Sequence, residues 1–161
     1  MSTRSTISLK IAESDKGKTF HFDESKLPSA YEGCSHDFID KVGDIVIKKD
    51  YLTIYHHWDG YPVGGVGQTL VENFNDYDAI LNLLCGGDAS SINGEVIIQY
   101  CAWRGESWKS VQPKQSDKEP EVEQEYAYLF KDGKWFFKGW EAEEWTDLEE
   151  YLETHKDEEE D

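Results

Sequence analysis

The chain has 161 residues, of which 34 are Asp or Glu and 16 are Lys or Arg, so its formal net charge is -18. This length suits one domain with one hydrophobic core, and an aromatic content of 14 % excludes a wholly disordered acidic chain. The negative charge excludes a general affinity for nucleic acids and anionic membranes, because both attract cationic proteins.

The N-terminal segment 3–11 alternates polar with apolar residues, which predicts a strand with one buried face. It lacks the apolar run of a signal peptide, and no segment approaches the roughly 18 apolar residues of a membrane span. Cys34, Cys85 and Cys101 lack the spacing of a disulfide framework or a zinc ribbon. We therefore expect a soluble, cytoplasmic protein with reduced cysteines, and we assign it no cofactor and no metal.

The middle of the chain carries both strand and helix signals. Residues 38–55 predict a hairpin with a Lys-Lys-Asp turn. The hydrophobic spacing that follows predicts two short helices within residues 62–85. Pro62 suits the first position of the first helix, because its missing N–H costs nothing there. Asp76 or Asp78 is expected to cap the second helix, which should end at a pair of glycines.

The C-terminal part carries the clearest local signals. Residues 95–103 predict another strand, and residues 104–124, rich in charges and proline, predict a long, exposed and mobile loop. In the segment 126–138, an Asp-Gly pair predicts a two-residue type I′ turn and a hairpin with aromatic pairs across its strands. The apolar spacing after it predicts a C-terminal helix with Thr146 as its N-cap.

Together these elements predict one α+β domain over residues 1–156. Its centre would be a mainly antiparallel sheet of about five or six strands, with the two short helices on one side. An acidic helix would follow the last hairpin. Residues 157–161 are all acidic and are expected to form a disordered tail.

The most unusual chemistry lies in the glycine-rich segment before the first predicted helix. Gly64, Gly65 and Gly67 precede that helix closely, and free backbone N–H groups in such a place bind anions. The segment lacks the lysine of a Walker A loop and the context of a dinucleotide-binding motif. In the alternative interpretation, the glycines only let the chain turn tightly against the sheet.

Polar side chains close to these glycines complete a candidate site. His57 and Asp59 share a parity on the predicted strand, so the carboxylate can orient the imidazole, whereas His56 should face the opposite side. Arg4 can pair with Asp59 if their strands are neighbours, either as a structural contact or as a cation for an anion pocket. We assign no catalytic residue. The candidate ligand-binding residues are Arg4, His57, Asp59, Gly60, Gly64, Gly65 and Gly67.

Several of these residues belong to a wider pattern. It consists of Thr3-Arg4-Ser5, His57-Trp58-Asp59-Gly60-Tyr61-Pro62, Gly65-Val66-Gly67, Leu70 and the Gly-Asp-Ala-Ser-Ser turn at 87–91. The pattern resembles that of a family of small uncharacterised proteins from bacteriophages and prophages, over residues 1–92. The resemblance implies a phage or mobile-element setting and a cytoplasmic site of action, and it implies no particular activity.

Three classes of function fit these features. The first is a non-enzymatic module that binds a small anionic or nucleotide-like ligand at the candidate residues. The second is an acidic interaction protein that acts on a host protein, for instance by imitating nucleic acid. The third is a small hydrolase that uses His57 and Asp59. We favour the first class. No motif of a nucleophilic triad is present, and five of the acidic residues lie in the expected tail, whereas imitation of nucleic acid needs acids on a rigid surface.

Overall fold

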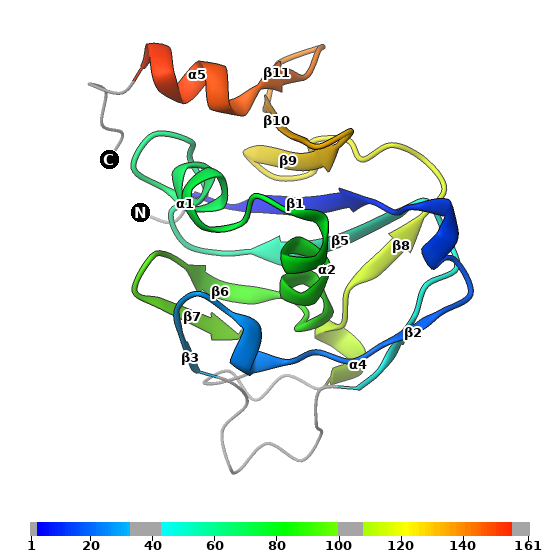
Figure 1. Cartoon of the computed structure of the whole chain (residues 1–161). Coiled ribbons are helices and arrows are strands. Elements are labelled where there is room, and N and C mark those ends of the chain that lie inside the picture. The colour runs from blue at the N-terminus through cyan, green and yellow to red at the C-terminus, as the bar shows by residue number, and fades with distance from the viewer. Residues whose placement is uncertain (1–2, 33–42, 100–107, 156–161) are drawn as a thin grey trace.

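The structure is a computed structural model, which describes residues 3–32, 43–99 and 108–155 (Figure 1). Its helices and strands are β1 (Ser5–Lys10), η1 (Glu13–Asp15), β2 (Thr19–Phe20), η2 (Glu24–Lys26), β3 (Ala30–Glu32), β4 (Ile45–Val46), β5 (Tyr51–His56), α1 (Val66–Asn73), α2 (Tyr77–Cys85), β6 (Ala89–Ile92), β7 (Val96–Gln99), α4 (Trp108–Val111), β8 (Lys114–Ser116), β9 (Tyr126–Lys131), β10 (Lys134–Gly139), β11 (Thr146–Asp147) and α5 (Leu148–Thr154).

In the described part of the chain, nine strands form one mixed sheet. Its order is β11-β10-β9-β1-β5-β6-β7-β3, and β8 pairs with β5 beside this path. The pairs β9–β10 and β1–β5 are antiparallel, whereas β1–β9, β5–β6 and β3–β7 are parallel. β2 and β4 form a separate two-stranded ladder.

The prediction of a smaller, mainly antiparallel sheet is therefore wrong, although the α+β class is confirmed. The central strand β1 has a parallel neighbour, β9, from the last third of the chain, and no local pattern indicates such a distant pairing. Residues 114–116, expected in a loop, form β8 and pair with β5. The predicted hairpin over residues 38–55 is also wrong, because β4 pairs with β2 and β5 pairs with β1.

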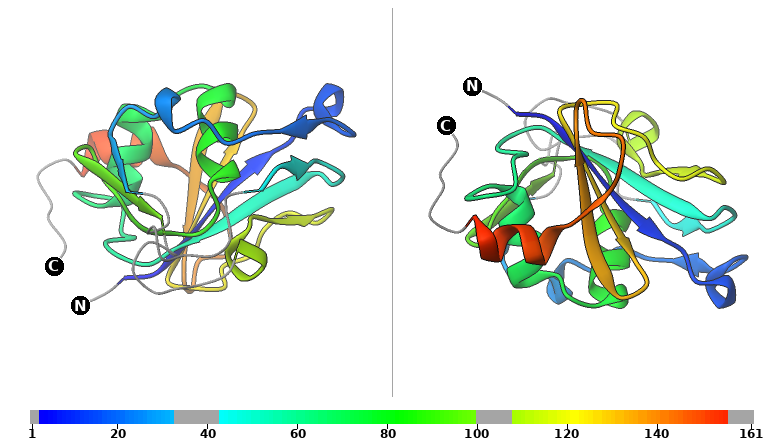
Figure 2. Two further views of the ribbon diagram at one scale, coloured as in Figure 1. Left: turned by 90° about the horizontal axis from the view of Figure 1, so that it is seen from below. Right: turned by 90° about the horizontal axis from the view of Figure 1, so that it is seen from above.

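The two short helices after β5 are present. The Asp76 carboxylate accepts a hydrogen bond from Ala79 N at 2.8 Å, so Asp76 caps α2, which ends at Gly86 as predicted. α1 begins only at Val66, so Pro62 is not its first residue. Figure 2 shows α1 and α2 on one side of the central strands and α4 on the other.

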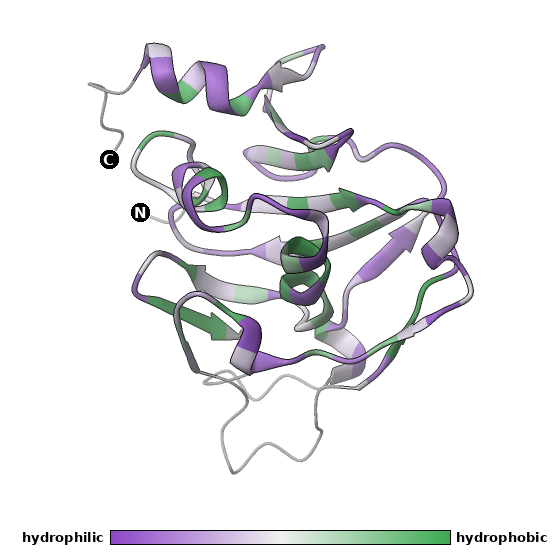
Figure 3. Ribbon diagram, in the orientation of Figure 1, coloured by the Kyte–Doolittle hydropathy of each residue, from purple (hydrophilic) through white to green (hydrophobic). Residues whose placement is uncertain are grey.

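The hydrophobic core lies between α1, α2 and the central strands. Ile7 and Leu9 of β1 and Leu52 and Ile54 of β5 are at most 1 % exposed, and burying each such side chain contributes roughly 1.5–3 kcal/mol. β7 and α2 are largely hydrophobic, whereas β8 and most of α5 are hydrophilic (Figure 3). Cys85 is buried in this core, and burial raises the pKa of its thiol to about 12. It is therefore an inert packing residue at neutral pH.

The predicted C-terminal hairpin is confirmed in its register. Phe130 faces Trp135 with ring centroids 5.3 Å apart. The turn residues Asp132 and Gly133 have φ values of 54° and 78°, as a type I′ turn requires. This local pairing places Tyr128, Phe130, Trp135 and Phe137 in the core.

The C-terminal helix begins at Leu148, and its N-cap is Asp147 rather than Thr146. The Asp147 carboxylate accepts a hydrogen bond from Glu150 N at 3.0 Å. Tyr151 packs edge-on against Phe137 of β10, with ring centroids 4.8 Å apart. The expected tail, 157–161, lies outside the described residues, as do residues 104–107 of the expected loop.

Candidate functional site

The loop between β5 and α1 ties three strands together. Asp59 has a φ of 56°, which is uncommon for a residue other than glycine. After it, Gly60 N donates to Thr3 O at 2.7 Å, and the buried Tyr128 hydroxyl donates to Gly60 O at 2.6 Å. A Cβ on Gly60 would lie 2.6 Å from Thr3 O. The loop therefore approaches β1 too closely for any side chain at this position.

Replacing Tyr128 by phenylalanine is expected to lower the free energy of unfolding by about 1–2 kcal/mol. The ring would keep its place in the core, but Gly60 O would lose its buried donor. Urea unfolding monitored by tryptophan fluorescence measures the difference. An unchanged free energy of unfolding would mean that this hydrogen bond does not hold the loop.

Gly64 and Gly65 precede α1, and Gly67 lies in its first turn. Gly64 has a φ of 77° and donates its N–H to Gln68 Oε1 at 2.9 Å. A Cβ on Gly65 would lie 2.3 Å from Tyr61 O, and one on Gly67 would lie 3.0 Å from the Tyr128 ring. Gly65 and Gly67 therefore require glycine for packing, whereas Gly64 favours glycine through its positive φ.

The N–H groups at the start of α1 already have acceptors inside the loop. Val66 N donates to Asp59 O at 2.8 Å, and Gln68 N donates to Pro62 O at 3.0 Å. Gly67 N reaches Tyr61 O at 3.4 Å. This arrangement favours the interpretation in which the glycines let the chain turn, because the donors that an anion needs are engaged.

His57 and Asp59 make separate contacts. His57 Nδ1 lies 2.8 Å from the Tyr55 hydroxyl, and its ring meets Trp58 edge-on. Asp59 is exposed and accepts a hydrogen bond of 3.4 Å from the Tyr61 hydroxyl. The two residues, both in the described part of the chain, do not hydrogen-bond each other. In that part, no three His, Cys, Asp or Glu residues are grouped to hold a metal ion.

Arg4 is exposed at the start of β1. Its carbonyl accepts a hydrogen bond from Glu125 N at 3.1 Å, and Arg4 lines a surface hollow together with residues 123–126, Gly139 and Trp140. β1 and β5 are neighbours, but the described contacts include no ion pair between Arg4 and Asp59. The candidate side chains at positions 4, 57 and 59 are therefore not joined to one another by hydrogen bonds or ion pairs.

His56 is fully buried, at 0 % exposure, whereas His57 is half-buried. Its Nε2 accepts a hydrogen bond from Ile92 N at 3.1 Å, so its proton is on Nδ1, 3.2 Å from Ser5 Oγ. Burial, and secondarily the nearby His57, lower the pKa of His56 to about 3. The imidazole is therefore neutral at physiological pH.

Four lysines that were not predicted as site residues gather around a pocket of about 450 Å³. We call it the lysine pocket. Its lining residues are Lys48, Lys49, Lys109, Ser110, Gln112, Pro113, Lys114 and Gln115. None of these described residues carries a carboxylate, and the described ion pairs involve other lysines. The sequence signal was the lysine content of segments 48–49 and 109–118 in an otherwise acidic chain.

Gln115 holds the two sides of the lysine pocket together. Its Oε1 accepts hydrogen bonds from Lys48 N at 2.7 Å and Lys49 N at 3.2 Å, and its Nε2 donates to Val46 O at 2.9 Å. Three hydrogen bonds from one side chain thus fix the segment after β4 against β8. Lys48 and Lys49 of the first segment and Lys114 of β8 therefore line the same pocket.

A second cleft, of about 430 Å³, lies on the sheet face opposite α1 and α2. Thr6 of β1 and Thr53 of β5 line its floor, and residues 114–123, which lead from β8 toward β9, line its wall. We call it the threonine cleft. It shares Lys114 and Gln115 with the lysine pocket, so the two hollows are contiguous at β8.

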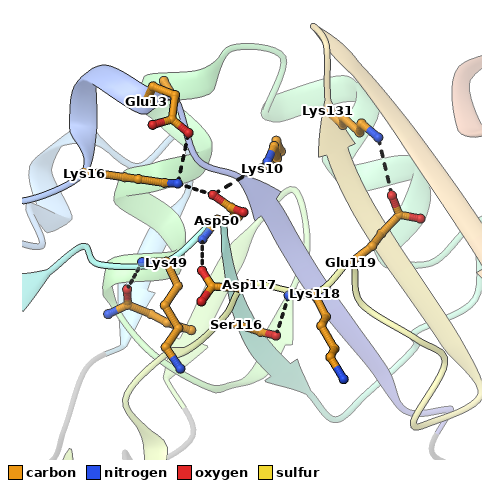
Figure 4. Close-up of polar contacts among 12 residues, drawn as sticks. Lys10, Glu13, Lys16, Lys49, Asp50, Ser116, Asp117, Lys118, Glu119 and Lys131 are labelled. Atoms are coloured by element: carbon orange, nitrogen blue, oxygen red, sulfur yellow. Dashed lines mark hydrogen bonds and ion pairs between the residues drawn. The ribbon is translucent and has the colours of Figure 1, made fainter.

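A hydrogen bond ties the segment after β8 to the ion-paired residue Asp50, just before β5 (Figure 4). Asp50 pairs with Lys16 and, at 3.9 Å, with Lys10, and its backbone N–H donates to the Asp117 carboxylate at 3.4 Å. The hydrogen bond from Lys16 lowers the pKa of the Asp50 carboxyl. The segment after β8 is thereby held at the end of the β1–β5 pair.

Comparisons of the chain with protein-family models, with curated protein sequences and with solved structures return no match. Among the described residues, none of the helices has the length and apolar character needed to cross a membrane. The site must therefore be interpreted from its own geometry.

Proposed function

We propose that this protein is a non-enzymatic binding module for a small anion, which it holds in the lysine pocket. The observation that carries the proposal is the gathering of Lys48, Lys49, Lys109 and Lys114 around one pocket without a carboxylate in its described lining. Ammonium groups held close together repel one another, and a bound anion relieves that repulsion. The proposal keeps the predicted class of ligand but moves its site away from the glycine loop.

The lysine pocket supplies what the glycine loop does not. Its ammonium groups each carry three donors and a full charge, which suits the oxygens of a phosphate group. The N–H groups before α1 instead donate to Asp59 O, Tyr61 O and Pro62 O. The resemblance to phage proteins stays a prediction, and the binding proposal does not depend on it.

Inorganic pyrophosphate is expected to raise the melting temperature of the protein by a few degrees. A ligand at ten times its Kd contributes about 1.4 kcal/mol of stability, which corresponds to roughly 3–5 °C for a chain of this size. The double variant Lys109→Gln/Lys114→Gln should lose most of this shift, since it removes two of the four charges. Raising the ionic strength should weaken the shift in the wild type. Differential scanning fluorimetry measures these melting temperatures.

The matched control is Lys18→Gln, which removes one charge from a lysine that pairs with Asp15 at 3.7 Å, outside the pocket. It should retain the full shift. General stabilisation by an excluded salt would raise the melting temperatures of all three proteins equally. Equal shifts in the double variant and the wild type, or no shift in the wild type, would contradict the proposal.

A further inference from the structure

We propose that the threonine cleft receives the hydroxyl-bearing part of the same ligand, so that the ligand is a monosaccharide phosphate. The inference rests on the proposed function, because it assigns the phosphate group to the lysine pocket. It adds a second subsite, formed by side chains on the central strands β1 and β5. Three observations support it: an unpaired buried hydroxyl, the position of Lys114, and the composition of the cleft wall.

The first observation concerns Thr6. Its side chain lines the cleft and is only 6 % exposed, yet its Oγ1 has no hydrogen-bond partner, the single such buried side-chain atom in the described chain. A buried hydroxyl without a partner costs free energy. Because this hydroxyl is shielded from solvent, the Thr6 side chain must turn about χ1 toward the cleft, where a ligand hydroxyl would supply the missing hydrogen bond. Beside it, the Thr53 hydroxyl bonds Ser8 Oγ at 2.7 Å and keeps further hydrogen-bonding capacity.

The second observation is that one residue connects the two hollows. Lys114 lines both, and in the β5–β8 ladder it lies directly opposite Thr53. Side chains opposite each other in an antiparallel pair have their Cβ atoms about 4.5–5.5 Å apart. A phosphate at the Lys114 ammonium and a hydroxyl above Thr53 can therefore belong to one small molecule. A monosaccharide phosphate carries both kinds of group.

The third observation is the composition of the cleft wall. Glu121 and Glu123 line the cleft, form no ion pair within the described chain, and can accept hydrogen bonds from sugar hydroxyls. Glu119 has other partners, the Lys131 ammonium at 3.4 Å and Trp145 Nε1 at 2.7 Å. Figure 4 shows the Glu119 carboxylate facing Lys131, while Lys118 extends away from it.

The same wall argues against a nucleotide. None of the described residues that line either hollow is aromatic, and aromatic side chains are the usual platforms on which proteins stack bases. Carboxylates along the wall would also repel a second phosphate group in the cleft. A sugar ring with one phosphate satisfies both constraints.

The test compares the affinities of inorganic phosphate, ribose 5-phosphate, glucose 6-phosphate, ribose and adenosine monophosphate by isothermal titration calorimetry. At least one sugar phosphate is expected to bind at least tenfold more tightly than inorganic phosphate. Thr6→Val should remove that advantage and leave the affinity for inorganic phosphate unchanged. Thr6→Ser, which keeps the hydroxyl, should retain it. In the absence of ligand, Thr6→Val should not lower the melting temperature, because the hydroxyl it removes has no partner.

The outcomes separate this inference from the proposed function. If inorganic phosphate binds through the lysines but no sugar phosphate binds more tightly, the inference fails and the proposed function stands. The inference also fails if Thr6→Val binds the sugar phosphates as the wild type does, or if adenosine monophosphate binds more tightly than every sugar phosphate. If none of the anions binds, both proposals fail. The exposed threonine variant Thr19→Val on β2 is the matched control and should behave as the wild type.

Discussion

Replacing Gly65 by alanine should prevent folding or lower the free energy of unfolding by more than about 3 kcal/mol. The added Cβ would lie 2.3 Å from Tyr61 O and 2.6 Å from Asp59 O. Both are backbone atoms, so no change of rotamer relieves the clash. Asp59 O also accepts the hydrogen bond from Val66 N at the first residue of α1. The substitution therefore forces the loop and the start of the helix apart, and urea unfolding measures the loss.

Two other glycines provide controls for Gly65→Ala. A Cβ at Gly64 would meet nothing within 4 Å, but the φ of 77° makes alanine unfavourable there, at a cost of roughly 1 kcal/mol. Gly94 also has open space around its Cβ position and no positive φ, so Gly94→Ala should change stability very little. The free energy of unfolding is expected to be highest for Gly94→Ala, lower for Gly64→Ala and lowest for Gly65→Ala. A Gly65→Ala protein as stable as Gly94→Ala would contradict the close approach.

Two features determined by neighbouring residues were predicted correctly from the sequence, the β9–β10 turn and Asp76 as one of two proposed caps of α2, whereas the expected start of α1 and the expected cap of α5 were wrong. The turn at Asp132 and Gly133 determines the register of β9 against β10, because a two-residue turn allows only one register. The cap at Asp76 sets the start of α2 in the same way. Both depend on contacts within a few positions along the chain, which a local pattern contains.

The sheet was predicted poorly because its centre depends on distant contacts. Thr6 and Ser8 were expected on an exposed face of β1, yet both are buried, at 6 % and 0 % exposure. The alternation of residues in β1 predicts which side chains share a face of the strand. It does not predict that residues 114–123 cover the polar face. The parallel pairing of β1 with β9 is equally invisible in the sequence of either strand.

The two hollows were missed for the same physical reason. Lys48 and Lys109 are far apart in sequence, and their segments are brought together by long-range contacts, among them the hydrogen bonds of Gln115 and the β5–β8 ladder. The glycine loop attracted attention because its unusual residues are consecutive. In the structure, those residues satisfy steric and hydrogen-bond requirements of the loop itself.

Acidification from pH 7 to pH 4.5 is expected to lower the free energy of unfolding by about 3 kcal/mol through His56 alone. In the folded state, burial lowers the pKa of His56 to about 3, and its Nε2 accepts the Ile92 N–H. In the unfolded state, the same imidazole takes up a proton near its ordinary pKa of about 6.5. Between these two values the unfolded state binds more protons, so stability falls as the pH falls. Above about pH 7 the imidazole is neutral in both states, so its protonation no longer lowers the free energy of unfolding.

Urea unfolding at half-unit intervals from pH 7 to pH 4.5 tests this, with His56→Gln as the variant that cannot titrate. The variant should be less stable than the wild type at pH 7 by about 2–4 kcal/mol, because it disturbs the hydrogen bonds to Ile92 N and Ser5 Oγ. Its stability should nevertheless fall less steeply toward pH 4.5. The exposed Thr19 carries no titratable group and provides the control: Thr19→Val should keep the slope of the wild type. Parallel pH profiles for His56→Gln and the wild type would show that another group drives the acid transition.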